Sequence, residues 1–162
     1  TMGMQPIVGY NFGAQKIDRV KQTLRLGIIS GVVITSSGFV ICEFFPHAVS
    51  ALFTDSDELI DLAVGGIRLT VLMFPFVGAQ IVIGNFFQSI GKAKVSIFLS
   101  LTRQLLYLLP CLLLFPNWWG LEGIWISMPV SDALAFVTAV ISLMIYIKKV
   151  SKEHPIANKV AE

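Results

Sequence analysis

The stretch LTVLMFPFVGAQIVIGNFF, residues Leu69 to Phe87, decides the fold class. It contains no charged side chain, and a helix of about 20 apolar residues is long enough to cross the hydrocarbon core of a bilayer. Three more stretches share its length and apolar character: Leu26 to Phe45, Val95 to Phe115 and Ile124 to Ile147. The sequence therefore predicts an all-α fold, a polytopic transmembrane helical bundle with four complete spans.

The segments that flank these spans complete the predicted organisation. Thr1 to Phe12 is apolar but too short to span, so it is interpreted as the end of a fifth span in a fragment of a longer protein. The helix that contains the second span is expected to begin earlier, near Asp57. Residues 1–150 are predicted to form the bundle, and residues 151–162 are predicted to form a cytoplasmic tail.

The composition supports a membrane protein and argues against other classes. Hydrophobic residues make up 55% and charged residues 14% of the chain, whereas roughly 25% of the residues in soluble domains are charged. The formal net charge of +2 is too small to indicate a nucleic-acid partner. The chain is therefore expected to be an integral protein whose immediate partner is the lipid bilayer.

The connections between the spans predict the orientation. Three are rich in Lys and Arg: Gly13 to Arg25, Gly91 to Lys94, and the segment that begins at Lys148. They alternate with Pro46 to Asp61 and Pro116 to Gly123, which contain acidic residues and no Lys or Arg. Because basic loops of membrane proteins stay in the cytoplasm, this alternation places the basic connections and the C-terminus on the cytoplasmic side.

Polar side chains inside the second span are candidates for a functional site. Gln80, Gly84 and Gln88 are spaced four residues apart, so they share one helical face, and Asn85 lies beside them. Pro75 precedes this stripe and removes a backbone hydrogen bond one turn earlier. A kinked helix with a polar stripe suits a water-filled cavity or a moving element, and it equally suits hydrogen bonding between packed helices. Both interpretations stay open at this stage.

Asp132 is the carboxylate that lies well inside a predicted span, and Arg103 interrupts the span before it. Each residue follows the start of its span by eight positions, or roughly 12 Å at 1.5 Å per residue. In a core of about 30 Å the two depths then differ by only about 6 Å. The sequence therefore predicts an Arg103–Asp132 ion pair. The pair is interpreted either as structural or as a site that couples transport to a proton or another cation.

Prolines and small residues predict how the helices bend and pack. Helix kinks are expected at Pro6, Pro75, Pro110 and Pro129. Small side chains recur every four residues at Gly27, Gly31 and Thr35, and again at Ser127, Ser131, Ala135 and Ala139. Such ridges let helix backbones approach closely in lipid. We interpret both ridges as packing faces.

The sequence indicates neither an enzyme nor a metal site. Cys42 and Cys111 both lie in apolar stretches, and their spacing matches no metal or disulfide framework. Gly91 and Lys92 lack the remaining residues of a phosphate-binding loop, and no paired catalytic carboxylates or nucleophile elbow are found. No catalytic residue, metal ligand or bound cofactor is therefore predicted.

Four motifs, in this order, resemble the multidrug and toxic compound extrusion (MATE) transporters. They are GMQPIVGYNFGAQ, LFTDSDELI, FPFVGAQIVIGNFFQSIGKAKVSIFLSLTRQ and GLEGIWISMPVSD, which begin at Gly3, Leu52, Phe74 and Gly120. The resemblance covers essentially the whole chain. It implies a twelve-helix protein of two six-helix bundles around a central cavity, in which this chain is the end of helix eight and helices nine to twelve.

The resemblance also implies a function. Such proteins exchange cationic or amphiphilic drugs for protons or sodium ions by alternating access, and the N-terminal part of the transporter would be this chain's partner. A bacterial inner (plasma) membrane is the implied location. From the polar stripe, and not from an exact family match, we expect the substrate or the cavity to be faced by Gln80, Asn85 and Gln88. Asn11 is also expected to face a lumen or a partner helix, where the first helix is broken.

The sequence departs from the family in one respect. Some members have an acidic residue in the helix that matches the second span, whereas Leu69 to Phe87 contains none. The choice between proton and sodium coupling therefore stays open. The alternative function is a truncated membrane bundle that does not transport and has a structural or assembly role. These residues alone would provide only part of a central cavity, so they are predicted not to transport by themselves.

Overall fold

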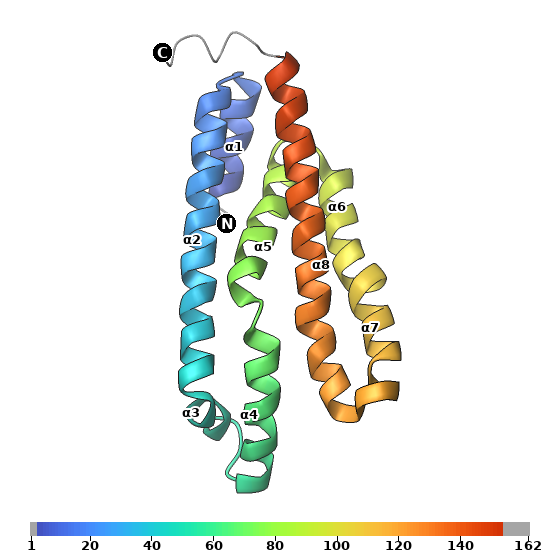
Figure 1. Cartoon of the computed structure of the whole chain (residues 1–162). Helices are drawn as coiled ribbons and strands as arrows, with labels where there is room; N and C mark the ends of the chain where they lie inside the picture. Colours follow the sequence, from blue (N-terminus) through green and yellow to red (C-terminus); the bar gives the residue numbers. More distant parts are fainter. Residues whose placement is uncertain (1–2, 154–162) are drawn as a thin grey trace.

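The computed structural model describes residues 3–153, with side chains through residue 150, and this part of the chain is entirely helical. The predicted tail begins at the end of the last helix, and most of it lies outside the described residues. Figure 1 shows the elements in chain order: α1 Met4–Gly13, α2 Ile17–Phe44, α3 Pro46–Ala51, α4 Asp57–Val71, α5 Phe74–Ser89, α6 Ala93–Leu101, the π-helix η1 Thr102–Leu108, α7 Leu109–Leu114 and α8 Pro116–Glu153.

Three helical segments of the described chain are long and apolar enough to cross a membrane: Ile17–Phe44, Ala93–Leu114 and Pro116–Val150. Helices α4 and α5 pass the same test as a pair that is bent by 49°. Figure 1 shows them running one after the other from one end of the bundle toward the opposite end, so we describe them as one bent span. The predicted bundle of four spans is recovered in this form, and α1 lies where the end of a fifth was expected.

The outer surface of the bundle is apolar. Ile34, Leu113 and Ile145 are 71%, 66% and 64% exposed, and many other large apolar side chains point outward in the same way. A soluble protein rarely exposes contiguous apolar surface on this scale, whereas hydrocarbon favours it. The exposed faces therefore fit a lipid environment.

The charged residues gather at the two ends of the bundle. The α1–α2 and α5–α6 connections and the end of α8 lie toward one end in Figure 1, which carries basic residues such as Lys16, Lys92 and Lys148. The opposite end holds α3, the start of α4 and the α7–α8 connection, with acidic residues such as Asp57 and Glu122. The basic and acidic connections that alternate along the chain thus lie at opposite ends of the bundle, which has a basic end and an acidic end.

Helices α2 and α5 approach most closely where two glycines face one another. A Cβ atom built on Gly78 would lie 2.5 Å from the carbonyl oxygen of Gly31, and it would also overlap the hydroxyl group of Thr35. A Cβ atom on Gly31 would lie 3.0 Å from the carbonyl oxygen of Gly78. Only hydrogen fits at Gly78, and at Gly31 a methyl group would press against the facing backbone. The ridge of Gly27, Gly31 and Thr35 is therefore a packing face, as predicted.

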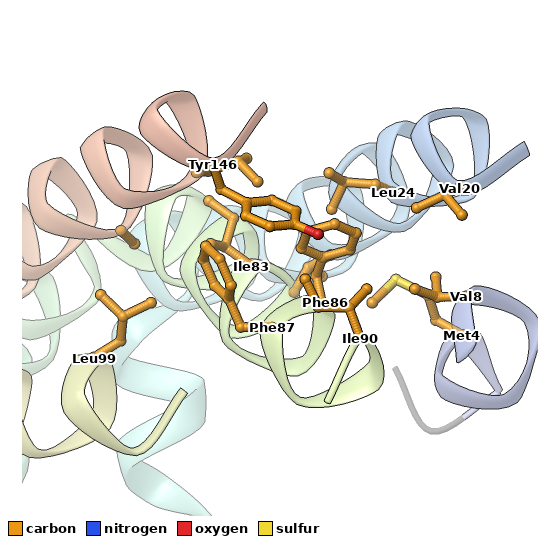
Figure 2. Packing of buried hydrophobic residues seen from close by; sticks show 13 residues of the cluster. Met4, Val8, Val20, Leu24, Ile83, Phe86, Phe87, Ile90, Leu99 and Tyr146 are labelled. Atoms are coloured by element: carbon orange, nitrogen blue, oxygen red, sulfur yellow. The ribbon is translucent and has the colours of Figure 1, made fainter. Parts of the chain in front are cut away.

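A buried apolar cluster lies nearer the basic end, where α5 is enclosed by α1, α2, α6 and α8 (Figure 2). Phe86, Phe87 and Tyr146 form a set of aromatic contacts with ring centroids 5.6 to 6.0 Å apart, an arrangement that edge-to-face packing favours. The second ridge also packs inward, since Ser127, Ser131, Ala135 and Ala139 are all buried. Helix α5 is therefore the central helix of this bundle.

The prolines bend the chain less uniformly than the sequence predicts. Pro75 lies in the first turn of α5, directly after the break between α4 and α5, so its predicted kink is confirmed. Pro110 lies in the first turn of α7, where the π-helix ends. A proline lacks the backbone N–H that would continue the preceding hydrogen-bond ladder, which suits both places.

Helices α1 and α8 continue through the other two prolines, and the kinks predicted at Pro6 and Pro129 stay predictions. Helix α1 runs unbroken from Met4 to Gly13, with Pro6 as its third described residue. Helix α8 continues through Pro129, and its non-helical backbone angles occur at Gly120, with φ of 54°. A positive φ is readily adopted by glycine, so the chain turns at Gly120.

The glycine contact gives a first prediction. We expect Gly78→Ala to lower the free energy of unfolding by about 1–3 kcal/mol, the usual cost of inserting a methyl group where no space exists. Gly84→Ala is the matched control on the same helix, because a Cβ atom there would meet nothing within 4 Å. Denaturant titration of the purified protein in detergent measures both. Equal stability of the two variants would contradict the close α2–α5 contact.

Candidate functional site

A polar cavity opens between α5 on one side and α6 with η1 on the other. Its volume is about 260 Å³. Side chains that donate or accept hydrogen bonds dominate its lining, which comprises Gln80, Ile81, Gly84, Asn85, Gln88, Ser96, Leu99, Ser100, Arg103 and Gln104. A polar cavity within an otherwise apolar bundle is a candidate binding site, because polar groups at such depth require partners.

The polar stripe on α5 provides one wall of this cavity. Gln80, Asn85 and Gln88 all line it, so the structure brings together three of the four residues predicted to face a cavity. Gln80 is buried, and its Oε1 atom accepts no hydrogen bond. A buried amide oxygen without a partner is costly, and a ligand or a water molecule in the cavity would satisfy it.

Asn11 lies apart from the others. It is buried on α1, its side-chain amide donates to the carbonyl oxygen of Ile7 over 2.8 Å, and its Oδ1 atom has no partner. It is not among the residues that line the polar cavity. Burial agrees with the expectation that Asn11 avoids lipid, but nothing places it at a substrate site.

The residues of the opposite cavity wall were not predicted from the sequence. Ser96, Ser100 and Gln104 line the opposite wall, from α6 and η1. They recur every four residues, the same signal that identified the stripe on α5. Gln5 of α1 was also missed: its Nε2 atom lies 3.4 Å from Gln88 Oε1 and 3.5 Å from Asn85 Oδ1, at the outer limit of hydrogen bonding.

The predicted ion pair is present at the edge of the cavity. The Nε group of Arg103 donates to Oδ1 of Asp132 over 2.8 Å, a charge-assisted hydrogen bond between η1 and α8. The Asp132 side chain is 9% exposed and that of Arg103 is 35% exposed. A second link follows one turn later, where the hydroxyl groups of Tyr107 and Thr138 lie 2.8 Å apart. The hairpin of the third and fourth spans is thus fastened by two polar contacts.

A π-helix positions Arg103. Residues Thr102–Leu108 form η1, and Arg103 is its second residue. The wider turn of a π-helix shifts the side chains of one turn relative to those of a regular α-helix, and such segments are frequent at functional sites. Arg103 is also the only charged residue that lines the cavity in the described part of the chain. Its pairing with Asp132 leaves the cavity wall without net charge.

These features define a class of protein. Apolar helices that can cross a membrane, and a polar cavity between helices with an ion pair at its edge, make the chain part of an integral membrane protein with a site at membrane depth. Comparisons with known proteins identify the family within this class.

The family model described as MatE matches residues 1–113. The chain is 24% identical over 149 residues to the multidrug export protein MepA of Staphylococcus aureus strain MSSA476, an alignment that covers 90% of this chain and 31% of MepA. Its fold matches the solved inward-facing conformation of a multidrug resistance MATE family transporter of the MOP superfamily, with a TM-score of 0.86 at 18% identity over 92% of this chain and 35% of that one. The outward-facing conformation of a transporter of that description gives a TM-score of 0.85 at 18% identity, over 92% of this chain and 34% of that one.

The chain therefore belongs to the MatE family, which confirms the resemblance found in the sequence. It spans about a third of the length of the relatives and structures that it matches. The solved structures share its fold, and their low sequence identity extends the comparison no further.

The ion pair gives a second prediction. Asp132→Ala leaves Arg103 without its counter-charge, and we expect a loss of about 1–3 kcal/mol in the free energy of unfolding. This is less than the 3–5 kcal/mol typical of a broken, fully buried pair, because Arg103 is 35% exposed. Reversible denaturation in detergent measures the loss. The neutral double variant Arg103→Gln, Asp132→Asn is expected to recover part of it.

A second ion pair provides the control. Glu43 lies 3.9 Å from Arg68, and the side chains are 35% and 53% exposed. Removing Glu43 should change the stability by less than about 1 kcal/mol, as is usual for exposed pairs. If Asp132→Ala cost no more than Glu43→Ala, the Arg103–Asp132 pair would have no structural role.

Proposed function

We propose that this chain is part of a secondary active multidrug efflux transporter, which exchanges cationic or amphiphilic drugs for protons or sodium ions by alternating access. Membership of the MatE family carries the proposal. The name of MepA, a multidrug export protein, supports drugs as the substrate class. The partner in this proposal is the remaining part of the transporter, since the chain spans 31% of the length of MepA.

The polar cavity is the part of the site that this chain contributes. Amide groups of Gln80, Asn85 and Gln88 and the hydroxyl groups of Ser96 and Ser100 line it. Polar groups of this kind orient a ligand by hydrogen bonds, while the apolar side chains of the same cavity contact its hydrophobic part. This chemistry suits a transporter whose substrates share amphiphilic character rather than a common structure.

Alternating access is proposed to move this bundle as a body. The fold matches the inward-facing and the outward-facing structures with TM-scores of 0.86 and 0.85, each over 92% of the chain. Rocking of one rigid bundle against another is a common transport mechanism.

The Arg103–Asp132 pair is the candidate site of ion coupling. With the pair intact, the two charges cancel at the cavity wall. A proton on Asp132 would leave the charge of Arg103 uncompensated, and that charge would repel a cationic drug. A proton and a drug cation would then occupy the site alternately, which is the requirement for exchange. A sodium ion on the Asp132 carboxylate would act in the same way.

The efflux experiment tests the proposed function. In cells that express the full-length transporter, we expect Gln88→Ala to reduce dye efflux about three- to tenfold, the effect of losing one neutral hydrogen bond. We expect Asp132→Asn to abolish the dependence of efflux on the coupling ion. Efflux in buffers with and without sodium, at matched membrane abundance, measures both effects and distinguishes sodium from proton coupling.

Gln22→Ala is the matched control, because Gln22 is an exposed residue of α2 that does not line the cavity. Normal efflux by both Gln88→Ala and Asp132→Asn would remove these residues from the mechanism. A full-length protein that transports nothing in any buffer would favour the alternative, a membrane bundle with a structural role.

The proposed orientation places the basic end and the C-terminus in the cytoplasm, and the protein in a bacterial plasma membrane. We expect a cysteine in Asp57→Cys to react with a membrane-impermeant maleimide in intact cells, and one in Lys94→Cys to react only after permeabilisation. Both positions are exposed. Cys42 and Cys111, and any cysteine in the remainder of the full-length protein, are replaced by Ala in both variants so that each carries one reactive thiol. The reverse labelling pattern would invert the orientation.

A further inference from the structure

A second depression lies on a different side of the bundle from the polar cavity. It is a groove of about 500 Å³ between α2 and α8. Its walls are apolar and include Ile28 and Ile29 of α2 and Leu143 and Ile147 of α8. The groove continues toward the α1–α2 connection as a smaller apolar cavity, which shares Lys21, Leu24 and Ile147 with it. None of these residues lines the polar cavity.

Two cations border this groove. Lys21 and Arg25 both line it, and their spacing of four residues places them on one face of α2, one turn apart. Within the described part of the chain, neither has an ion pair or a hydrogen bond from its side chain. Arg25 is exposed and Lys21 is partly exposed, so both charged groups are accessible to a ligand.

The dimensions of the groove fit the end of a membrane lipid. From Lys21 to Ile29 the helix rises by roughly 12 Å at 1.5 Å per residue, with the cations at the basic end and the isoleucines deeper in the membrane. A lipid presents the same sequence of chemistry, a phosphate at the headgroup level followed by an acyl chain. Long basic side chains also reach the headgroup level from helix ends, with their alkyl stems packed on apolar surface.

We propose that this groove binds an anionic phospholipid from the leaflet at the basic end of the bundle. Lys21 and Arg25 hold the phosphate, and Ile28, Ile29 and Ile147 contact the first part of one acyl chain. Charge complementarity selects an anionic lipid, because Asp18 is the only acidic residue near these cations on α2. A lipid in this position bridges α2 and α8 on the face that α5 leaves open. The proposal is independent of the transport function.

The test uses the full-length protein, purified in uncharged detergent and titrated with phosphatidylglycerol or phosphatidylcholine, with bound lipids resolved by native mass spectrometry. We expect wild type to prefer phosphatidylglycerol. We expect Lys21→Gln, Arg25→Gln to lower that affinity by about 30-fold, or roughly fivefold for each basic residue removed. The matched control is Lys16→Gln, Arg19→Gln, which removes two charges from the same end of α2 but from residues outside the groove. Its affinity should change by less than about twofold.

Ile29→Trp tests the apolar half of the site. It fills the groove and leaves both cations in place, and losing contact with two methylene groups should weaken lipid binding by roughly tenfold. Equal losses in the groove variant and the Lys16, Arg19 control would show a diffuse surface charge and overturn the proposal. Unchanged binding to Ile29→Trp, or competition by inorganic phosphate as strong as that by lipid, would also overturn it. A full-length protein that does not prefer phosphatidylglycerol would also overturn the proposal, because another part of the protein would then cover the groove.

Discussion

The contact between α2 and α5 at Gly31 and Gly78 is the constraint on which the rest of the bundle depends. Within lipid the hydrophobic effect gives helices little reason to associate, so they are held by close packing and by polar contacts. A backbone approach that leaves room only for hydrogen brings the two helices together. It also places α5 at the centre, where α1 and α8 pack against the same helix.

A central helix contacts different neighbours on its different faces, and α5 accordingly has apolar side chains on some faces and polar side chains on another. Phe86 and Phe87 enter the aromatic cluster with Tyr146, whereas Gln80, Asn85 and Gln88 line the polar cavity. Neither set would be stable in the place of the other, because phenyl rings gain nothing from polar partners and buried amides require them. The cavity is therefore a consequence of the packing of α5, and its polar lining is held on a helix that is fixed from several sides.

Much of this arrangement could be predicted from the sequence. The lengths of the apolar stretches predict the four spans, and the charges between them predict the separation of charge. The Arg103–Asp132 pair could be predicted because the depth of a residue in the membrane follows from its number along a helix. The π-helix at Thr102–Leu108 and the turn at Gly120 could not be predicted, because each depends on how neighbouring helices pack. The helices that contain Pro6 and Pro129 are continuous, because the position of a proline in the sequence does not by itself end a helix.

The position of the ion pair links structure to the proposed exchange. Arg103 faces the cavity and is partly exposed, whereas Asp132 is almost enclosed behind it. An ion that reaches Asp132 must therefore pass the guanidinium group or displace it, and in either case the charge balance of the cavity wall changes by one unit. In a region without bulk water, such a change is felt strongly by any charged ligand nearby. A purely structural pair would be expected to lie away from the cavity, packed between helices on both sides. The location of the pair at the edge of the polar lining is thus the feature that favours a coupling role. A structural role concerns folding and is measured by the stability of the Asp132 variants. A coupling role concerns the response to ions and is measured by their efflux.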